Sequence, residues 1–280
     1  MSVKLLTDSS AYITDTVLSE LDITTISLNV IINHVSKREI EFTQEEFYGQ
    51  LKSLTELPTS SQPTIEEMYQ AFEKLVLAGH EIVSIFLSSK MSGTYSSAHL
   101  VRDMILETYP HAMIHILDAE STAMEMGLMV TAAARQALLG ESAENVIKTA
   151  HYVRTHSRFL FSPDTLEYLK KGGRIGSASA LLGTLLQIKP ILTVEQGETT
   201  IFKKVRTKKK VIAAFLEQLA LDHNTNPVSE IVVHHIECLE DAKQLQAQLQ
   251  ELYTCPISIH DIGPVVGLHV GPGSVGVVYY

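Results

Sequence analysis

The sequence is poor in cysteine, has an excess of acidic over basic residues, and contains no long apolar run. Its two cysteines, Cys238 and Cys255, are too few for a disulfide framework and lack zinc-finger spacing. The formal net charge of -10 disfavours binding to nucleic acid or to anionic lipid, because such proteins carry a basic face. No window approaches the roughly 18 apolar residues of a membrane span, and no signal-peptide pattern opens the chain. We therefore expect a cytoplasmic protein without an integral membrane segment.

Motifs of several enzyme classes are missing as well. The chain contains neither a GxxxxGK[ST] phosphate loop nor an HExxH metal motif. The segment GGRIGS at 172–177 follows a predicted helix rather than a strand, which does not support ATP binding by this chain. His234 and His235 are adjacent in a strand pattern, where side chains point to opposite faces and cannot chelate one metal together. We expect no metal and no cofactor.

The elements that are present alternate between strand and helix. Strands are predicted at 81–87 and 113–119, each followed by a helix, at 95–109 and 124–140. Short connections between them indicate a parallel α/β layer. The regular alternation of predicted strands and helices changes near 158–163. A chain of 280 residues is also long enough for two domains. We therefore predict an N-terminal α/β domain over 1–157 and a C-terminal α+β domain over 158–280.

Local signals predict further elements. The segment 24–32 is predicted to form one strand-rich run. A threonine followed three residues later by glutamate predicts a capping box at the start of a helix over 43–54. A pair of strands is expected over 190–205, with Gln196 and Gly197 as the turn.

Three hydroxyl-rich segments stand at strand or loop ends. SSKMSGTYSS at 88–97 lies between a predicted strand and a predicted helix, TDSS at 7–10 follows the first strand, and TSSQPT at 59–64 leads into a helix. One interpretation is that Ser92 or Thr94 simply caps the helix. Alternatively, hydroxyls and helix N-terminal amides together suit an anion. Because ligands lie beyond the carboxyl ends of parallel strands, the loops after the first strand and after 81–87 are expected to converge.

The glycine-rich stretch 263–276 carries one histidine, His269. A lone histidine can be structural. We expect this one to lie in a loop rather than on a helix face, where glycines permit close approach to a ligand. A Ser, His, Asp hydrolase using Ser92, His269 and Asp8 is conceivable, but Ser92 lies in KMSGT rather than in GxSxG.

Basic residues gather in KKVRTKKK at 203–210 and in KKGGR at 170–174, against the acidic balance of the chain. They can be a solvated surface or a docking patch for an acidic or nucleotide-carrying partner. The sequence alone leaves both interpretations open.

These segments together resemble the DegV family, the bacterial fatty-acid-binding proteins that serve as the binding subunit of a fatty acid kinase. The resemblance runs along the whole chain. Its motifs are TDSS at 7–10, TSSQPT at 59–64, SSKMSGTYSSA at 88–98, LEYLKKGGRIG at 166–176, QIKPIL at 187–192 and GPVVGLHVGPGSVGVVYY at 263–280.

The resemblance implies a two-domain DegV-like fold, with an N-terminal parallel, Rossmann-like α/β sheet, a C-terminal mixed α+β domain, and the ligand tunnel between them. It implies that Ser60, Ser92 and His269 bind the carboxylate of one long-chain fatty acid. The family usually has threonine where this chain has Ser60, so the hydroxyl is kept and a methyl group is lost. Arg174 and Arg206 match basic positions that the family uses near the carboxylate end of the tunnel and for docking the kinase.

The function implied is that of a non-enzymatic carrier. It presents the bound carboxylate to a separate ATP-dependent fatty acid kinase, which makes an acyl phosphate for phospholipid synthesis. We expect a monomer that brings neither nucleotide nor metal. The alternatives are a serine-dependent acyl hydrolase using Ser92 and His269, and a small-molecule sensor or structural protein that holds no lipid.

Overall fold

The computed structural model describes residues 2–183 and 188–280, so the first residue of the QIKPIL motif lies outside the described residues. Contacts within the chain define two compact units, which we describe separately. The first unit comprises Met1–Glu41 and Ser60–Thr155, and the second comprises Phe42–Thr59 and His156–Tyr280. The boundary predicted between 157 and 158 stays a prediction. Among the described residues, no helix is both long enough and apolar enough to cross a membrane.

A four-stranded sheet with the order β2-β1-β6-β7 forms the centre of the first unit, and all of its strands are parallel. Its strands are β1 (Val3–Asp8), β2 (Thr24–Ile26), β6 (Glu81–Phe86) and β7 (Ile114–Asp118). This sheet confirms the predicted parallel α/β layer. The predicted strand-rich run over 24–32 is confirmed, and it consists of β2 and β3 (Asn29–Ile32), which belong to different sheets.

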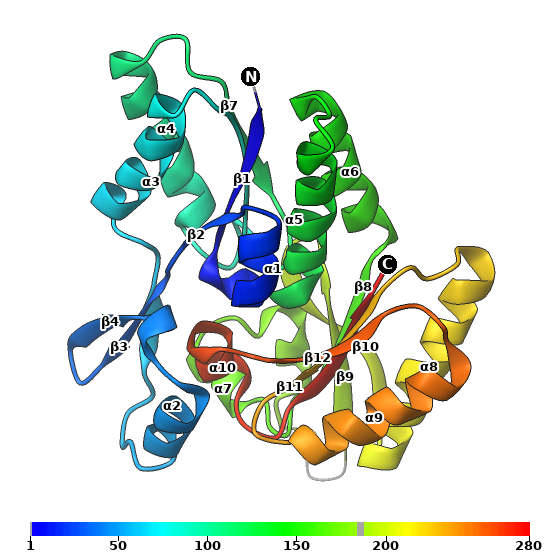
Figure 1. Cartoon of the computed structure of the whole chain (residues 1–280). Helices are drawn as coiled ribbons and strands as arrows, with labels where there is room; N and C mark the ends of the chain where they lie inside the picture. The colour runs from blue at the N-terminus through cyan, green and yellow to red at the C-terminus, as the bar shows by residue number, and fades with distance from the viewer. Residues whose placement is uncertain (1, 184–187) are drawn as a thin grey trace. The chain divides into compact units, whose positions relative to one another are not determined.

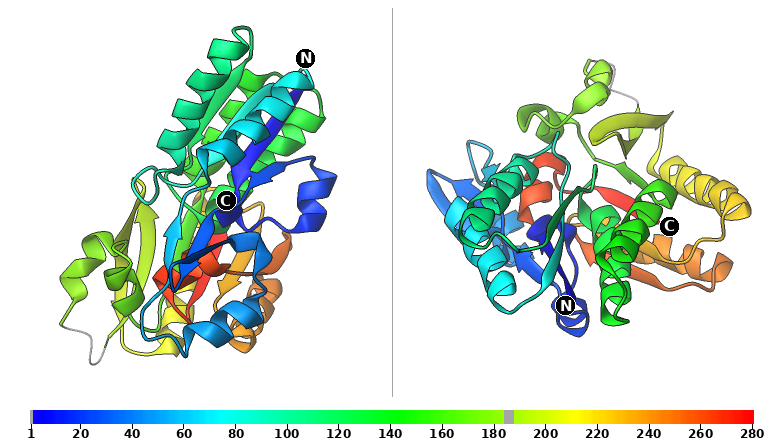
Figure 2. Two further views of the ribbon diagram at one scale, coloured as in Figure 1. Left: turned by 90° about the vertical axis from the view of Figure 1, so that its left-hand side faces the viewer. Right: turned by 90° about the horizontal axis from the view of Figure 1, so that it is seen from above.

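Helices cover both faces of this sheet (Figures 1 and 2). α3 (Ile65–Leu77) and α4 (Thr94–Thr108) bury apolar side chains against β1, β2 and β6 on one side. α5 (Ala123–Leu138) packs on β1 and β6 from the other side. The remaining elements of this part of the chain are η1 (Ser9–Ala11), α1 (Asp15–Glu20), β4 (Val35–Arg38), η2 (Glu39–Glu41), β5 (Thr59–Ser61) and α6 (Ala143–His156). β3 lies between β4 and β5 in a small three-stranded sheet.

The second unit contains a six-stranded mixed sheet with the order β10-β9-β8-β13-β11-β12. Its strands are β8 (Arg158–Ser162), β9 (Lys189–Glu195), β10 (Glu198–Val205), β11 (Ile231–His235), β12 (Ile257–Asp261) and β13 (Val275–Tyr279). β11 and β12 are parallel, whereas the other neighbours are antiparallel. Gln196 and Gly197 form the predicted turn between β9 and β10, with φ angles of 49° and 82°.

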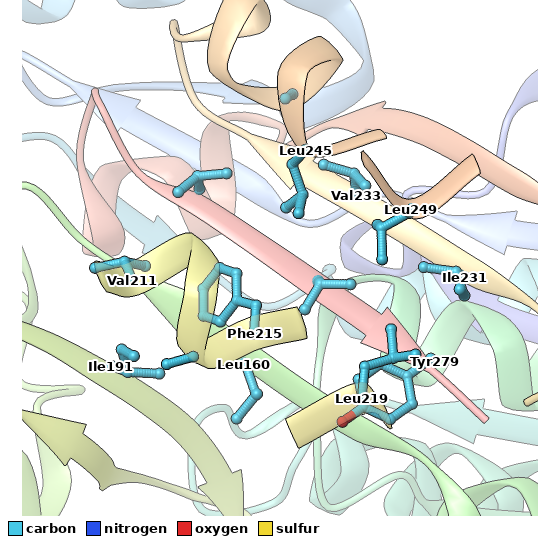
Figure 3. Packing of buried hydrophobic residues seen from close by; sticks show 14 of the residues in the cluster. Leu160, Ile191, Val211, Phe215, Leu219, Ile231, Val233, Leu245, Leu249 and Tyr279 are labelled. Carbon is cyan, nitrogen blue, oxygen red and sulfur yellow. The ribbon is translucent and has the colours of Figure 1, made fainter. Parts of the chain in front are cut away.

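Two long helices, α8 (Lys208–Thr225) and α9 (Leu239–Leu252), lie side by side against this sheet (Figures 1 and 2). Figure 3 shows their apolar side chains packed on those of the strands, with Phe215 and Leu245 among residues such as Leu160 and Tyr279. Fully burying one such side chain contributes roughly 1.5 to 3 kcal/mol. This core stabilises the six-stranded sheet, whose strand β13 belongs to the carboxyl-terminal segment.

Shorter helices complete the second unit: α2 (Gln44–Leu51), α7 (Glu167–Lys171), η3 (Gly176–Leu181) and α10 (Pro264–Val270). The predicted capping box of α2 is confirmed. The Thr43 hydroxyl accepts the amide of Glu46 at 3.2 Å, and the Glu46 carboxylate accepts the amide of Thr43 at 3.1 Å. α10 packs against both α2 and α7.

Candidate functional site

The loops that follow β1 and β6 meet at one edge of the parallel sheet. β1 and β6 are hydrogen-bonded neighbours, so their carboxyl ends lie side by side. Asp8 ends β1, and its Oδ2 accepts a hydrogen bond from the amide of Leu87, just beyond β6, at 2.9 Å. The predicted convergence of these two loops is confirmed.

Asp8 is fully buried and is held by the first unit itself. Its Oδ1 accepts the amide of Ser10 at 3.0 Å and the Ser10 hydroxyl at 2.5 Å. Burial raises the pKa of Asp8 to about 6, although the hydrogen bonds from Ser10 and Leu87 lower it. Among the described residues, the hydrogen-bond partners of the Asp8 carboxylate are Ser10 and Leu87 and include no histidine, so the use of Asp8 as the acid of a hydrolase triad is not supported.

Ser92 stands at the start of α4, at the end of a tight loop. The carbonyl of Ser88 accepts the amides of Met91 and Ser92, at 2.9 and 3.1 Å, which closes the turn after β6. The Ser92 hydroxyl lies 2.9 Å from that of Thr94 and accepts the amide of Thr94 at 3.3 Å. It therefore satisfies one amide of the first turn, but the N-cap residue is Gly93, which has no side-chain cap hydrogen bond, so neither Ser92 nor Thr94 is the cap itself. Ser92 is also partly exposed, at the helix end whose dipole favours an anion.

Ser60 lies in β5, in the same unit as Ser92, and is partly buried. Two residues further on, the side-chain amide of Gln62 donates to the hydroxyl of Ser97 in α4, at 2.7 Å. Ser97 follows Ser92 by five residues. The structure thus ties the segment of Ser60 to the segment of Ser92 through Gln62, a residue to which the sequence analysis gave no role. Its place in TSSQPT was the available signal.

His269 lies in the last turn of α10, so the prediction of a loop position was wrong. Pro264 at the first helical turn favours helix formation, and Gly271, with a φ of 85°, ends the helix. Glycine and proline usually indicate a loop, so the sequence did not predict this helix, in which Pro264 stands at the start and Gly271 at the end. Its interior glycine, Gly267, leaves room for the Tyr48 hydroxyl, which donates to the carbonyl of Ile262 at 2.7 Å.

Around Gly172 the second unit brings together two of the predicted site residues. A Cβ atom added to Gly172 would lie only 2.1 Å from Nδ1 of His269, so the imidazole packs directly on this glycine. The exposed Arg174 donates from Nη1 to the carbonyl of Gly172 at 2.7 Å. Burial, with a smaller contribution from Arg174, lowers the pKa of His269 to about 4. The result is a neutral imidazole close to a guanidinium, which favours an anionic ligand.

This lowered pKa predicts a pH dependence of stability. The unfolded chain binds more protons at His269 than the folded chain does between pH 6.5 and about 4. The contribution of His269 to the free energy of unfolding is therefore complete above pH 6.5 and is lost as the pH falls through about 4. As the pH falls across this range, the free energy of unfolding measured with urea should decrease less in His269→Gln than in the wild type.

The comparison between the two proteins is essential, because Asp8 acts in the opposite direction. Its raised pKa gives a contribution that is lost as the pH rises through about 6. Asp8 is present in both proteins, so its contribution cancels when the variant's unfolding free energy is subtracted from that of the wild type at each pH. Parallel curves for the two proteins would contradict the assigned pKa of His269.

Arg206 follows β10 on the exposed basic segment 203–210. Lys203 and Lys208 form ion pairs with Glu217 and Asp241. Within the part of the chain that the structure describes, ion pairs involve none of the other basic residues of this segment, which are Lys204, Arg206, Lys209 and Lys210. Three lysines occupy the first turn of α8, where positive charge opposes the helix dipole. The placement is electrostatically unfavourable, although Asp241 offsets the charge of Lys208.

The adjacent histidines of β11 have separate partners. His234 lies near the carbonyl of His260, with Nδ1 at 3.1 Å, and His235 contacts Asp261, with Nε2 at 2.9 Å from Oδ1. This agrees with side chains on opposite faces of the strand. Over residues 2–183 and 188–280, no three or more His, Cys, Asp or Glu side chains form a group that could hold a metal ion.

Comparisons with known proteins cover the whole chain. The family model described as the DegV family matches residues 2–280. A DegV domain-containing protein of Clostridium acetobutylicum is 45% identical over 280 residues, covering 100% of this chain and 98% of that protein. The solved structure of DegV from Bacillus subtilis, described as a fatty acid binding protein, is 33% identical with a TM-score of 0.89, covering 100% of this chain and 99% of that one. A Thermus thermophilus protein of this family, described for its fatty acid binding, has a TM-score of 0.91 at 27% identity, covering 100% of this chain and 99% of that one.

Proposed function

Since this chain belongs to the DegV family, we propose that it binds one long-chain fatty acid and presents the acid's carboxylate to a separate ATP-dependent fatty acid kinase. The observation that carries the proposal is the match over the full chain to structures described as fatty-acid-binding proteins. The fold class agrees between this chain and those structures. The carrier role adds a kinase partner, which rests on the family resemblance.

We assign the carboxylate to the hydroxyls of Ser60 and Ser92 and to the imidazole of His269. A carboxylate buried without donors is very costly, so a fatty-acid site needs several donors at one end and apolar side chains elsewhere. His269, with its pKa near 4, is a neutral donor at physiological pH, and Arg174 adds a positive charge beside it. A bound carboxylate stabilises the imidazolium and would raise this pKa.

The acyl chain supplies most of the driving force. At about 0.8 kcal/mol per methylene, burying a chain of roughly 16 carbons gives more than ~10 kcal/mol before the costs of ordering. Release into water is then slow, and the acid stays with the protein during purification. A carrier that acts as a monomer in the cytoplasm fits such a ligand, which needs protection from water between membrane and kinase.

The proposed transfer step belongs to the kinase, which would bring ATP and metal and form the acyl phosphate used for phospholipid synthesis. The exposed basic segment 203–210 supports docking of an acidic surface near Arg206. Formation of acyl phosphate from ATP and oleate by this protein alone would overturn the carrier role.

Charge reversal in Arg206→Glu tests the docking patch. We expect kinase-dependent acyl phosphate formation to fall by about tenfold or more, since a repulsive charge then faces the acidic partner. Oleate affinity should not change. Lys74→Glu, an exposed reversal in α3, is the matched control. Equal rates for Arg206→Glu and the control would place the docking surface elsewhere.

A further inference from the structure

Gln62 connects two elements of the first unit that are distant in sequence. Its Nε2 donates to the hydroxyl of Ser97 at 2.7 Å, and Ser97 is buried in α4. Its own carbonyl accepts the side-chain amide of Asn29 from β3 at 3.3 Å. Asn29 is also buried, so Gln62 is held at its backbone by one element and at its side chain by another.

The amide of Gln62 also lies against the backbone at the start of α4. A Cβ atom on Gly93, the N-cap residue, would stand 2.3 Å from Oε1 and 3.4 Å from Cδ of Gln62. Gly93 has a φ of -75°, which any residue adopts, so a side chain at 93 would not strain the backbone but would require the Gln62 amide to shift. The amide of Gln62 therefore occupies the space where a side chain at 93 would be, next to Ser92.

We propose that Gln62 is a positioning residue of the carboxylate site, because its amide clamps the segment of Ser60 to the segment of Ser92 and so sets the spacing of their hydroxyls. This inference rests on the proposed function, in which both hydroxyls bind the acid. A neutral amide suits the place, since a carboxylate there would repel the ligand at the anion-favouring end of α4. The clamp acts through Ser97 and does not itself touch the ligand.

Removing the clamp should loosen the site without unfolding the protein. We expect Gln62→Ala and Ser97→Ala each to weaken oleate binding by about tenfold, the scale of one lost hydrogen bond between positioned groups. Ser96→Ala, at the exposed neighbour of Ser97, is the matched control and should bind as the wild type does. Calorimetric titration gives the affinities, and thermal unfolding of the same samples reports stability.

A second variant separates positioning from general destabilisation. Gln62→Glu keeps the length of the side chain and can accept a hydrogen bond from the Ser97 hydroxyl, while adding a negative charge beside Ser92. We expect it to bind oleyl alcohol as the wild type does and oleate much more weakly. In Gln62→Ala, which lacks the clamp, a loss of affinity for both ligands that merely follows a loss of thermal stability would indicate a purely structural role and would contradict the inference.

The outcomes distinguish the inference from the proposed function. If the wild type binds one oleate and both alanine variants bind it equally tightly, the role of Gln62 is wrong and the proposed function stands. If the wild type itself takes up no oleate, the proposed function fails, and the inference fails with it.

Discussion

A Gly172→Ala variant is expected to lose its bound fatty acid and to unfold more readily than the wild type. The new methyl group would lie 2.1 Å from Nδ1 and 3.0 Å from Cε1 of His269, and 3.1 Å from the carbonyl oxygen of Tyr168. Gly172 has φ and ψ of -76° and -8°, which alanine adopts without strain. The effect is therefore steric, and it forces His269 away from its position. Such overpacking typically costs ~1 to 3 kcal/mol, which urea unfolding will measure.

The neighbouring glycine supplies the matched control. Gly173 has a φ of 71° and open space where a Cβ would lie. Gly173→Ala therefore carries a conformational cost of roughly 1 to 2 kcal/mol but no collision with the imidazole. It should be destabilised and yet keep its fatty acid. A Gly172→Ala variant that retained the acid as well as Gly173→Ala does would show that the position of His269 is unimportant for binding.

A double variant tests the mechanism of the first effect. In Gly172→Ala/His269→Ala the ring that collides with the new methyl group is absent, so most of the lost stability should return. The affinity for the acid should not return, because the donor is gone. If the double variant were as unstable as the sum of the two single changes, the contact between these residues would not be the cause.

His269→Ala and Ser92→Ala are each expected to weaken the binding of oleate while leaving the fold largely intact. Each removes a donor to a charged group, which costs on the order of 1 to 3 kcal/mol, or roughly a 5- to 150-fold loss of affinity. His151→Ala, at an exposed position of α6, is the control for loss of a histidine. Titration with oleate measures all three, and unchanged affinity in both site variants would refute the assignment of the carboxylate site.

Much of the secondary structure in both units could be predicted from local patterns. Periodicity and turn residues between 81 and 140 were sufficient for the parallel layer, and the register of β1 with β6 brought the two hydroxyl loops together as the topology requires. The capping box of α2 and the turn at Gln196 and Gly197 involve only near neighbours in sequence. Such signals are readable because every interacting group lies within a few residues.

The errors concern features that depend on distant contacts. α10 was missed because glycines and prolines usually indicate a loop, whereas here Gly267 is required by the Tyr48 hydroxyl, which a Cβ would approach to 1.9 Å. The contacts of Gln62 and Gly172 could not be derived from the sequence, although Gln62 lies in the TSSQPT motif, because each contact involves a side chain from another element.

If this chain carries one long-chain fatty acid, as we propose, the freshly purified protein should already hold it. Organic extraction of fresh protein, followed by mass spectrometry calibrated against protein concentration, measures the amount and the acyl length together. We predict close to one long-chain fatty acid per chain, because burial of the hydrocarbon makes release into water slow. A protein that is empty and that also takes up neither palmitate nor oleate would contradict the claim.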